Sequence, residues 1–284
     1  MSVSPNTPAA RPTRGVFLMM LVVFLVVLLP FLFWRSTWFG RSLTDREVEK
    51  YLLDTKHPRK TQHALVRIAE RITRGDQSVK RWYPQVQALT THENKELRAT
   101  VAWMMGQDNQ ADGFHQALLE LLEDSDPLVE RNAALSLVRF ADPRSKPTLR
   151  AMLQPYTFSA ARPGTIKLRL EVGEPVNPGT LLARLEVGED ELAELRSPLS
   201  GRVQQFLVAD GEQVEAGQPL LLISPAEEQT WEALRALYLL GDLEVLPLVE
   251  RFAQGGDAES ARIRQQAAAT AQAIRRRAQS QQEN

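Results

Sequence analysis

The sequence predicts a mainly α-helical protein with a β insertion, preceded by one N-terminal transmembrane helix. Three observations lead to this fold class. Residues 16–34 form an uncharged apolar run, amphipathic helical patterns lie on both sides of residues 156–225, and within those bounds short β-type runs separated by Gly and Pro replace the helical period. The expected parts are a disordered cytoplasmic tail over 1–15, a transmembrane helix over 16–34, helical repeats over 43–154, a β domain over 156–225, further helical repeats over 226–278 and a disordered tail over 279–284.

The composition is that of an ordinary globular protein, and it excludes several kinds of site. Of the 284 residues, 43% are hydrophobic and 24% are charged, and the net charge of -1 gives no reason to expect nucleic acid as a partner. Cysteine is absent from the sequence. That absence excludes disulfides, cysteine-ligated zinc, iron–sulfur clusters and a cysteine nucleophile.

The apolar run over residues 16–34 has the length of a membrane span. As a helix these residues would extend roughly 28 Å, close to the hydrocarbon thickness of a bilayer. Arg35 and Trp38 follow the run, and such an aromatic and basic border is typical of a membrane interface rather than of a signal-peptide cleavage site. A buried core helix is the alternative, but the run has no polar face. Arg11 and Arg14 precede it and basic residues also follow it, so the positive-inside rule does not fix the orientation.

Three helical stretches can be aligned with one another. Each carries an alanine at the same position, ends on an aspartate and is followed by another helical stretch. A small residue lets neighbouring helices approach closely, and a terminal aspartate can cap the next helix, as stacked helix pairs require. The aligned stretches are Leu97–Asp108, Arg131–Asp142 and Trp231–Asp242, with Ala99, Ala133 and Ala233 in register, and the helices expected after them are Phe114–Leu122, Pro147–Leu153 and Val245–Phe252.

This pattern resembles the HEAT and HEAT-like repeat family, with Glu123–Pro127 as the loop inside one repeat. Armadillo-like or other helical arrays, and an unrelated helical bundle, are the alternatives. Tyr51–Leu53 and Ala64–Ile72 predict an earlier repeat that caps the stack near the membrane. The resemblance implies a surface that binds other proteins. The large aromatic residues are interpreted as contacts between repeats, and these are Trp82, Trp103, Trp231 and Tyr238.

The β-type region repeats itself. Residues 166–179 and 203–217 each read as a strand, a glycine turn, a valine and a second glycine turn, and another strand follows. Glycine supplies the positive φ that such tight turns need. The matching positions are Gly173 with Gly211, Val176 with Val214, and Gly179 with Gly217.

The duplicated pattern resembles the biotinyl/lipoyl domain family, a flattened β-sandwich (barrel-sandwich hybrid) of two interlocked halves, and Ser197–Val203 resembles its entry to the second half. In carriers of this family, a lysine at the tip between the halves bears biotin or lipoate. The corresponding tip here is Glu186–Leu192, where Glu189 or Asp190 occupies the acceptor position. The domain's only lysine is Lys167. We therefore expect no attached cofactor and no carrier role.

The same family occurs in periplasmic membrane-fusion adaptors of efflux and secretion systems, which also have an N-terminal membrane anchor. Those adaptors carry a long α-hairpin between the two halves, whereas the segment from Leu185 to Ser197 is too short for one. Lipoyl-like folds bring their termini together. We therefore expect the β domain between the helices Pro147–Leu153 and Glu227–Leu240, in the place that Glu123–Pro127 takes one repeat earlier.

No catalytic, cofactor-binding or metal-binding residue is expected. None of the histidines has the spacing of a metal site, and each is interpreted as a surface or turn residue. The acidic tip over Glu186–Glu194 is predicted to be solvated or to face a partner, with a general acid–base pair as the alternative. Arg275–Arg277 are predicted to complement the dipole of the last helix rather than to bind anionic lipid or nucleic acid. The histidines are His57, His63, His92 and His115.

Together these features predict a non-enzymatic scaffold or accessory subunit that binds other proteins of a membrane complex through its repeats and its lipoyl-like domain. It would contact the lipid bilayer through residues 16–34, and no nucleic acid partner is expected. The expected location is the bacterial inner membrane, with the soluble part in the periplasm. A periplasmic adaptor-type component of an efflux or secretion system is the alternative, followed by an enzyme or a carrier.

Overall fold

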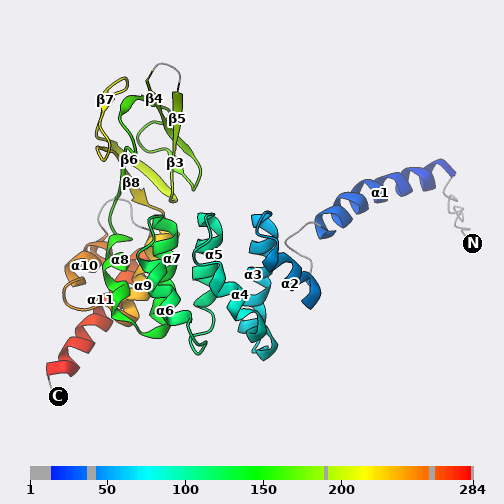
Figure 1. The fold of residues 1–284 in the computed structure, drawn as a ribbon, viewed down its shortest axis with the longest axis horizontal. Coiled ribbons are helices and arrows are strands. Elements are labelled where there is room, and N and C mark those ends of the chain that lie inside the picture. Colours follow the sequence, from blue (N-terminus) through cyan, green and yellow to red (C-terminus); the bar gives the residue numbers. More distant parts are fainter. Residues whose placement is uncertain (1–13, 37–42, 189–190, 256–259, 283–284) are drawn as a thin grey trace, which may run out of the picture.

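The computed structural model describes residues 14–36, 43–188, 191–255 and 260–282. It contains a helix near the N-terminus, a stack of helices and a β-sandwich that rises from one edge of the stack (Figure 1). The α-helices are α1 (Arg14–Ser36), α2 (Asp45–Leu53), α3 (Pro58–Thr73), α4 (Tyr83–Ala88), α5 (Lys95–Met105), α6 (Phe114–Leu122), α7 (Pro127–Leu137), α8 (Lys146–Ala151), α9 (Glu227–Leu240), α10 (Leu246–Gln254) and α11 (Ala261–Gln282). The 3-10 helices are η1 (Gln77–Trp82), η2 (Val138–Phe140) and η3 (Pro143–Ser145), and the strands are β1 (Tyr156–Ser159), β2 (Gly164–Leu168), β3 (Pro175–Val176), β4 (Leu181–Val187), β5 (Glu191–Arg196), β6 (Gly201–Phe206), β7 (Gln213–Val214) and β8 (Pro219–Pro225).

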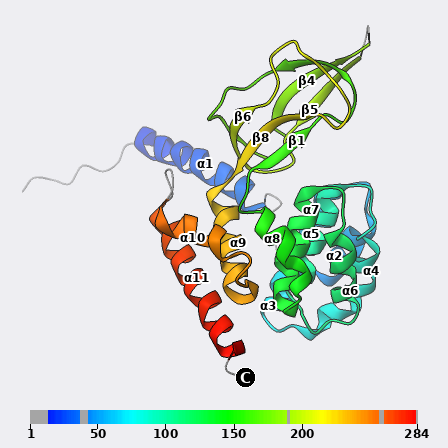
Figure 2. The ribbon, with the colours of Figure 1, turned by 90° about the vertical axis from the view of Figure 1, so that its left-hand side faces the viewer.

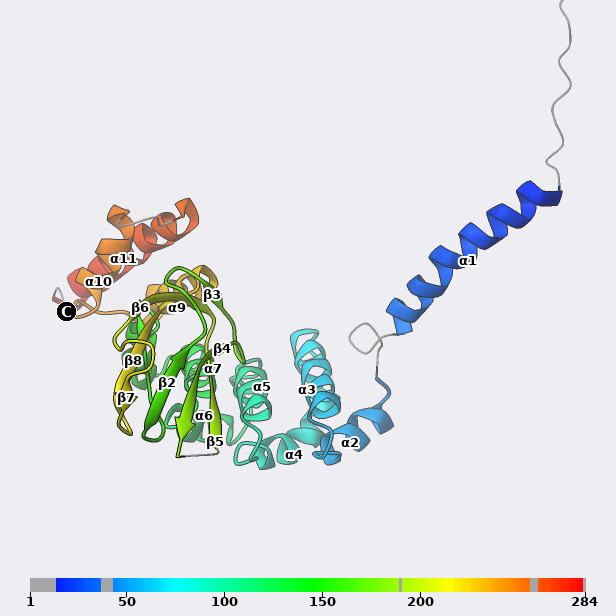
Figure 3. The same ribbon diagram turned by 90° about the horizontal axis from the view of Figure 1, so that it is seen from above.

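The helices of the stack come in pairs, each a shorter helix followed by a longer one: α2 with α3, α4 with α5, α6 with α7, α8 with α9, and α10 with α11. The longer helices α3, α5 and α7 pack side by side, as α9 and α11 do, and the shorter helices α2, α6, α8 and α10 pack against them (Figure 3). This alternation is the architecture of stacked helical repeats, and it confirms the predicted helical part of the fold.

Small residues let the longer helices α5 and α7 approach each other. Ser136 Oγ of α7 donates a hydrogen bond of 2.7 Å to the Ala102 carbonyl oxygen of α5, and Asn132 Nδ2 donates one of 3.0 Å to Ala99 O. A Cβ at Gly106 would overlap Ser136. The contact therefore depends on side chains no larger than those present, as the aligned alanines predict.

The three aspartates aligned in the sequence all close a turn, but only one caps the next helix. Each accepts a hydrogen bond from the backbone N–H two residues later. Asp142 is the N-cap of η3, which continues into α8. After Asp108 and Asp242 the chain needs further residues before it can turn into the next helix, so α6 follows Gly113 and α10 follows Val245. The expected cap is therefore wrong at those two aspartates.

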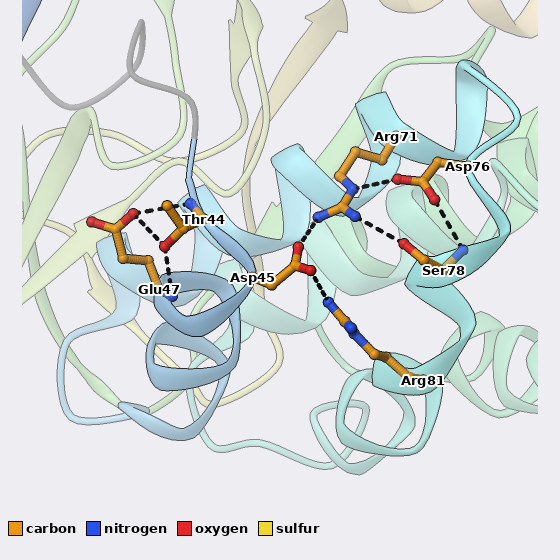
Figure 4. Close-up of polar contacts among 7 residues, drawn as sticks. All are labelled: Thr44, Asp45, Glu47, Arg71, Asp76, Ser78 and Arg81. Carbon is orange, nitrogen blue, oxygen red and sulfur yellow. Dashed lines mark hydrogen bonds and ion pairs between the residues drawn. The ribbon is translucent and has the colours of Figure 1, made fainter.

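A polar network closes the N-terminal end of the stack (Figure 4). Arg71 of α3 donates to Asp45 at the start of α2, and to Asp76 and Ser78 at η1, over 2.6, 2.7 and 2.9 Å. Arg81 pairs with the other carboxylate oxygen of Asp45. The network ties α2, α3 and η1 together, at the place where the sequence predicts an earlier repeat.

Replacing Asp76 by Asn should remove a pH-dependent part of the stability. Hydrogen bonds from Ser78, and then from Arg71, lower the pKa of Asp76 to about 2, whereas an aspartate in an unfolded chain has a pKa of about 3.9. A carboxyl group whose pKa is lowered by folding stabilises the folded state above the unfolded-state pKa, and this contribution is lost as the pH falls from about 4 to about 2. We expect Asp76→Asn to lower the thermal midpoint at neutral pH and to change it little near the folded-state pKa. Thermal melts followed by circular dichroism at neutral pH and near pH 2 would test this, with Glu49→Gln at an exposed residue as the control. An equal decrease of the thermal midpoint at both pH values would contradict the prediction.

The β-sandwich has two four-stranded antiparallel sheets, with strand orders β1–β8–β6–β3 and β5–β4–β2–β7. One apolar core contains Ile166, Leu185 and Leu220, and a second contains Leu182 and Val203. Both are separate from the two cores of the helical stack. The sandwich therefore has the cores of a domain of its own.

The two halves of the sandwich exchange equivalent hydrogen bonds. The Gly173 N–H donates to Val203 O over 2.8 Å, and the Gly211 N–H donates to Ile166 O over 2.8 Å. Both glycines have a positive φ, 93° for Gly173 and 81° for Gly211. Because each bond joins one half to the other, the halves are interlocked, as the duplicated sequence predicts. The second pair of glycines repeats the arrangement, with Gly179 donating to Ser197 and Gly217 donating to Ala160.

The chain enters and leaves the sandwich at one point. Tyr156 of β1 lies opposite Ile223 of β8, so the chain returns to the stack beside the place where it left (Figure 2). The sandwich is inserted between α8 and α9, in the position that a short loop takes between α6 and α7. The β4–β5 hairpin lies at the opposite end of the sandwich, away from the helices (Figure 1).

Deletion of residues 156–224, closed by a short glycine-rich linker, should leave a folded helical protein. The sandwich has its own cores, and its two ends are adjacent, so a short linker can join α8 to α9. We expect the helical circular dichroism signal to be retained, with a modest loss of stability because Arg131 loses its contact with the Tyr156 ring. Disappearance of the helical signal would reject the insertion of an independent unit.

Helix α1 covers the apolar run over residues 16–34. Its described side chains are exposed except for half-buried Leu28, with 65% exposed at Met19 and 49% at Phe31. Counting only the residues that the structure describes, no helix is both long enough and apolar enough to qualify as a membrane span. Residues 1–13, which make up most of the tail predicted over 1–15, lie outside the described residues.

The C-terminal helix α11 differs from the prediction in two respects. It continues to Gln282, so the segment 279–284, predicted to be a disordered tail, is helical over its described part. Arg275 pairs with a glutamate of α10, and Arg277 donates to carbonyl oxygens at the end of α9, among them Gly241 O at 2.8 Å. Arg275 therefore pairs with a carboxylate of α10, and Arg277 with backbone carbonyls at the C-terminal end of α9. Neither arginine complements the dipole of α11 as predicted, because both lie before its last turn.

Candidate protein-interaction site

The β4–β5 hairpin forms the free end of the sandwich. Strand β4 ends at Val187, Gly188 follows with a φ of 69°, and β5 begins at Glu191. Glu189 and Asp190, which the sequence places at the acceptor position, lie outside the described residues. No lysine occurs in the sequence of the hairpin, so it offers no amine for acylation.

The only lysine in the sequence of the sandwich lies outside the β4–β5 hairpin. Lys167 stands in β2, opposite Arg184 of β4. Its Nζ lies beside a turn of the second half, 3.9 Å from the position of a Cβ on Gly211. Lys167 therefore does not supply the amine that the hairpin lacks.

The carboxylates of the hairpin are partly neutralised. Glu191 and Glu194 pair with arginines over 2.8 and 2.6 Å. Glu186 is exposed and lies opposite Leu192, which is 60% exposed. The described part of the predicted acidic tip is thus a mixed surface, in which exposed Leu192 lies across from Glu186 and the other carboxylates pair with arginines.

A groove of about 520 Å³ crosses the face of the stack formed by α5, α7 and α9. Trp103 and Leu239 line it and are 41% and 57% exposed, and half-buried Leu135 and Val138 line it as well. The interpretation of aromatic residues as contacts between repeats is wrong for Trp103, and also for Tyr238, which is 44% exposed. Both side chains are exposed on the longer helices of the stack, Trp103 on α5 and Tyr238 on α9.

A buried arginine links α7 to α9. α5 and α7 pack along their length, whereas α7 and α9 touch only over a short segment. Arg131 Nη1 of α7 donates to Gln229 Oε1 of α9 over 2.9 Å, and its guanidinium lies 6.0 Å from the Tyr156 ring. Arg131 is only 7% exposed, and this burial lowers its pKa. Arg131 therefore joins α7 to α9 next to the first strand of the sandwich.

The rim of the groove carries two arginines and one glutamate, Glu232. Arg139 donates to Gln107 Oε1 over 3.2 Å, and Arg235 lies over the Trp231 ring at 4.6 Å from its centroid. In the described part of the chain, neither guanidinium has a carboxylate within ion-pairing distance. Both arginines can therefore form a charge-assisted hydrogen bond to a carboxylate of a partner.

Sequence reasoning does not identify Arg139, Arg235 or Leu239 as site residues. The groove forms between helices that the whole β domain separates along the chain, so no local pattern connects them. Trp103 in the last turn of α5 is the one signal in the sequence, and its exposure depends on the neighbouring helices.

The four histidines do not gather into one site. His57 and His115 each contact an aspartate, over 2.6 and 2.7 Å, and His92 accepts a hydrogen bond from a nearby backbone N–H. His63 is 4% exposed, so its interpretation as a surface or turn residue is wrong: it lies on the inner side of α3. Among the residues that the structure describes, no group of His, Asp and Glu side chains is arranged to hold a metal ion.

Comparison with known proteins gives two family matches. A family described as HEAT repeats matches residues 84–159, and a family described as Biotin-requiring enzyme matches residues 157–223. No curated protein matches the chain. One similar solved structure is the crystal structure of an engineered protein that is 13% identical, covering 81% of this chain and 78% of that chain with a TM-score of 0.40, a likeness too weak to support a conclusion.

The matched regions coincide with the helical stack and the inserted sandwich. The fold defines an α-helical repeat protein with a β domain set into one of its helix pairs. Within that class, the chain is a HEAT-like repeat protein with an inserted biotinyl/lipoyl-like domain whose hairpin lacks the acceptor lysine.

Proposed function

We propose that this chain is a membrane-anchored scaffold or accessory subunit, without enzymatic activity, that binds other proteins of a membrane complex. HEAT repeats and a lipoyl-type domain suggest protein-interaction or accessory roles. The observation on which the proposal rests is the groove of α5, α7 and α9, which exposes Trp103 and Leu239 beside Arg139 and Arg235. Tryptophan and arginine are among the residues that most often dominate the binding energy of protein interfaces.

The inserted sandwich supports the same proposal. Its hairpin has no lysine to carry a prosthetic group, so the domain has no swinging arm. The sandwich is nevertheless joined to the stack at one end and presents the opposite end to its surroundings (Figure 1). Insertions in the loops of a helical stack commonly form a binding face. The hairpin, with Glu186 and Leu192 exposed, is therefore a second surface for a partner.

The membrane anchor in this proposal is the run over residues 16–34. Helix α1 extends through it, and its described apolar side chains are exposed. Such a surface is unfavourable in water and favourable in a bilayer. The proposed location is the bacterial inner membrane, with the stack and the sandwich in the periplasm. The resemblance to periplasmic adaptors supports that orientation, because basic residues lie on both sides of the run and the positive-inside rule does not decide it.

An adaptor-type role in an efflux or secretion system is the weaker alternative. β4 ends at Val187 and β5 begins at Glu191, so the two halves of the sandwich are joined by a tight hairpin. That leaves no place for the long α-hairpin of such adaptors. An accessory position beside a membrane complex fits this geometry better.

Replacing Trp103 by Ala together with Leu239 by Ser should release the partner proteins. Truncation of a dominant interface residue commonly costs about 2 kcal/mol or more, which is roughly a 30-fold weakening. We expect the proteins that co-purify with the tagged chain from detergent-solubilised membranes to fall to background, as measured by quantitative mass spectrometry. The matched control is Leu53→Ser with Val172→Ser, at two residues that are 69% and 62% exposed away from the groove. Equal recovery of partners from both variants would overturn the role of the groove.

A reporter fused to the C-terminus should locate the body of the protein. We expect a reporter that is active only outside the cytoplasm to be active in this fusion. Removal of residues 14–36 should release the fusion from the membrane fraction and abolish the signal, because no other run in the sequence has this length without charge. A signal from a cytoplasm-specific reporter would reverse the proposed orientation, and membrane retention of the truncated chain would reject α1 as the anchor.

A further inference from the structure

The groove of α5, α7 and α9 and the β4–β5 hairpin have complementary surfaces. The groove exposes apolar side chains between two arginines, and the hairpin exposes Leu192 directly across from the carboxylate of Glu186. We propose that the groove receives the β4–β5 hairpin of a second copy of this chain, an inference that rests on the groove being a protein-binding site.

The apolar parts of the two surfaces match. In β5, Ala193 and Leu195 point into the sandwich, so the alternation of the strand directs Leu192 outward, where it is 60% exposed. The groove offers Trp103 and Leu239, both exposed, with a volume of about 520 Å³ between the helices. A leucine that enters this groove would bury its own surface and that of the tryptophan, which favours association.

The charged parts also match. Glu186 lies directly across from Leu192 on the same outward face of the hairpin. The rim of the groove holds Arg139 and Arg235, which have no carboxylate within ion-pairing distance in the described part of the chain.

Glu232 is the one carboxylate at the rim, so the charge of the groove remains positive. Opposite charge on the two surfaces accelerates their encounter and disfavours other orientations.

The occupant is a second copy because the hairpin of the same chain points away. β1 and β8 join the sandwich to the stack, and the hairpin lies at the other end, directed away from the helices (Figures 1 and 2). A contact between two different surfaces is heterologous, so it generates a head-to-tail series rather than a closed pair. Anchoring of each copy in the same membrane would raise the local concentration and favour such a series.

Complementation between two defective variants tests the proposal. The groove variant is Arg139→Glu with Arg235→Glu, and the hairpin variant is Glu186→Lys with Leu192→Lys. The matched control is Glu49→Lys with Leu53→Lys, which makes the same type of change at exposed residues of α2. The full-length chain in detergent is followed by sedimentation velocity over a range of concentrations, and circular dichroism verifies that each variant is folded.

We expect the wild type and the control to associate, and the dissociation constant to rise at least about tenfold in each defective variant alone. An equimolar mixture of the two variants should form a one-to-one complex, because one intact groove and one intact hairpin remain. Association should weaken as salt is added. A wild type that stays monomeric at every concentration, or folded variants that fail to complement each other, would overturn the proposal.

The outcomes separate this inference from the scaffold role. In one outcome the wild type is monomeric, and the groove variant loses its co-purifying proteins while the hairpin variant keeps them. This result assigns the groove to a different protein, so it rejects the second copy as the occupant but not the scaffold role. Self-association with complementation, but without any co-purifying protein, supports the second copy and rejects the scaffold for other proteins.

Discussion

The antiparallel pairing of β1 with β8 is the constraint on which the arrangement of the protein depends. Because the strands that enter and leave the sandwich are hydrogen-bonded to each other, a domain with its own cores fits where the stack otherwise has a short loop. α8 and α9 therefore remain neighbours, and the stack continues into α10 and α11. The same pairing directs the β4–β5 hairpin away from the helices, which makes it available to other molecules (Figure 1).

The sequence predicts the elements whose structure is decided locally. Phe114–Leu122 is expected as a helix and forms α6 with the same bounds. The turns at Gly173 and Gly211 follow from glycine, because only it takes a positive φ without strain. The duplicated halves also predict that these turns are equivalent, and the matched hydrogen bonds agree. In each of these cases the residue type and its immediate neighbours determine the conformation.

Contacts between distant segments are where prediction from the sequence is wrong or silent. Trp103 has the large apolar side chain of a core residue, and it is exposed only because of where α7 and α9 lie. His63 and Arg131 have polar side chains, yet neighbouring elements bury both. Arg277 lies near the C-terminus of the sequence but contacts the end of α9. A single sequence does not reveal these contacts, because the hydrophobic period of a helix shows which face is buried but not which segment buries it.

The seam between β1 and β8 also sets how the protein responds to tension. Both strands meet the stack at the same end, so a force that draws α8 away from α9 opens their ladder from Tyr156 and Ile223 onward, one hydrogen bond at a time. Peeling in this geometry needs less force than shearing a ladder whose bonds all bear load together. The bonds from Gly173 and Gly211 join the two halves elsewhere and are not in the path of that force. A load applied between α8 and α9 would therefore be released at this seam, while the bonds that interlock the two halves of the sandwich stay intact.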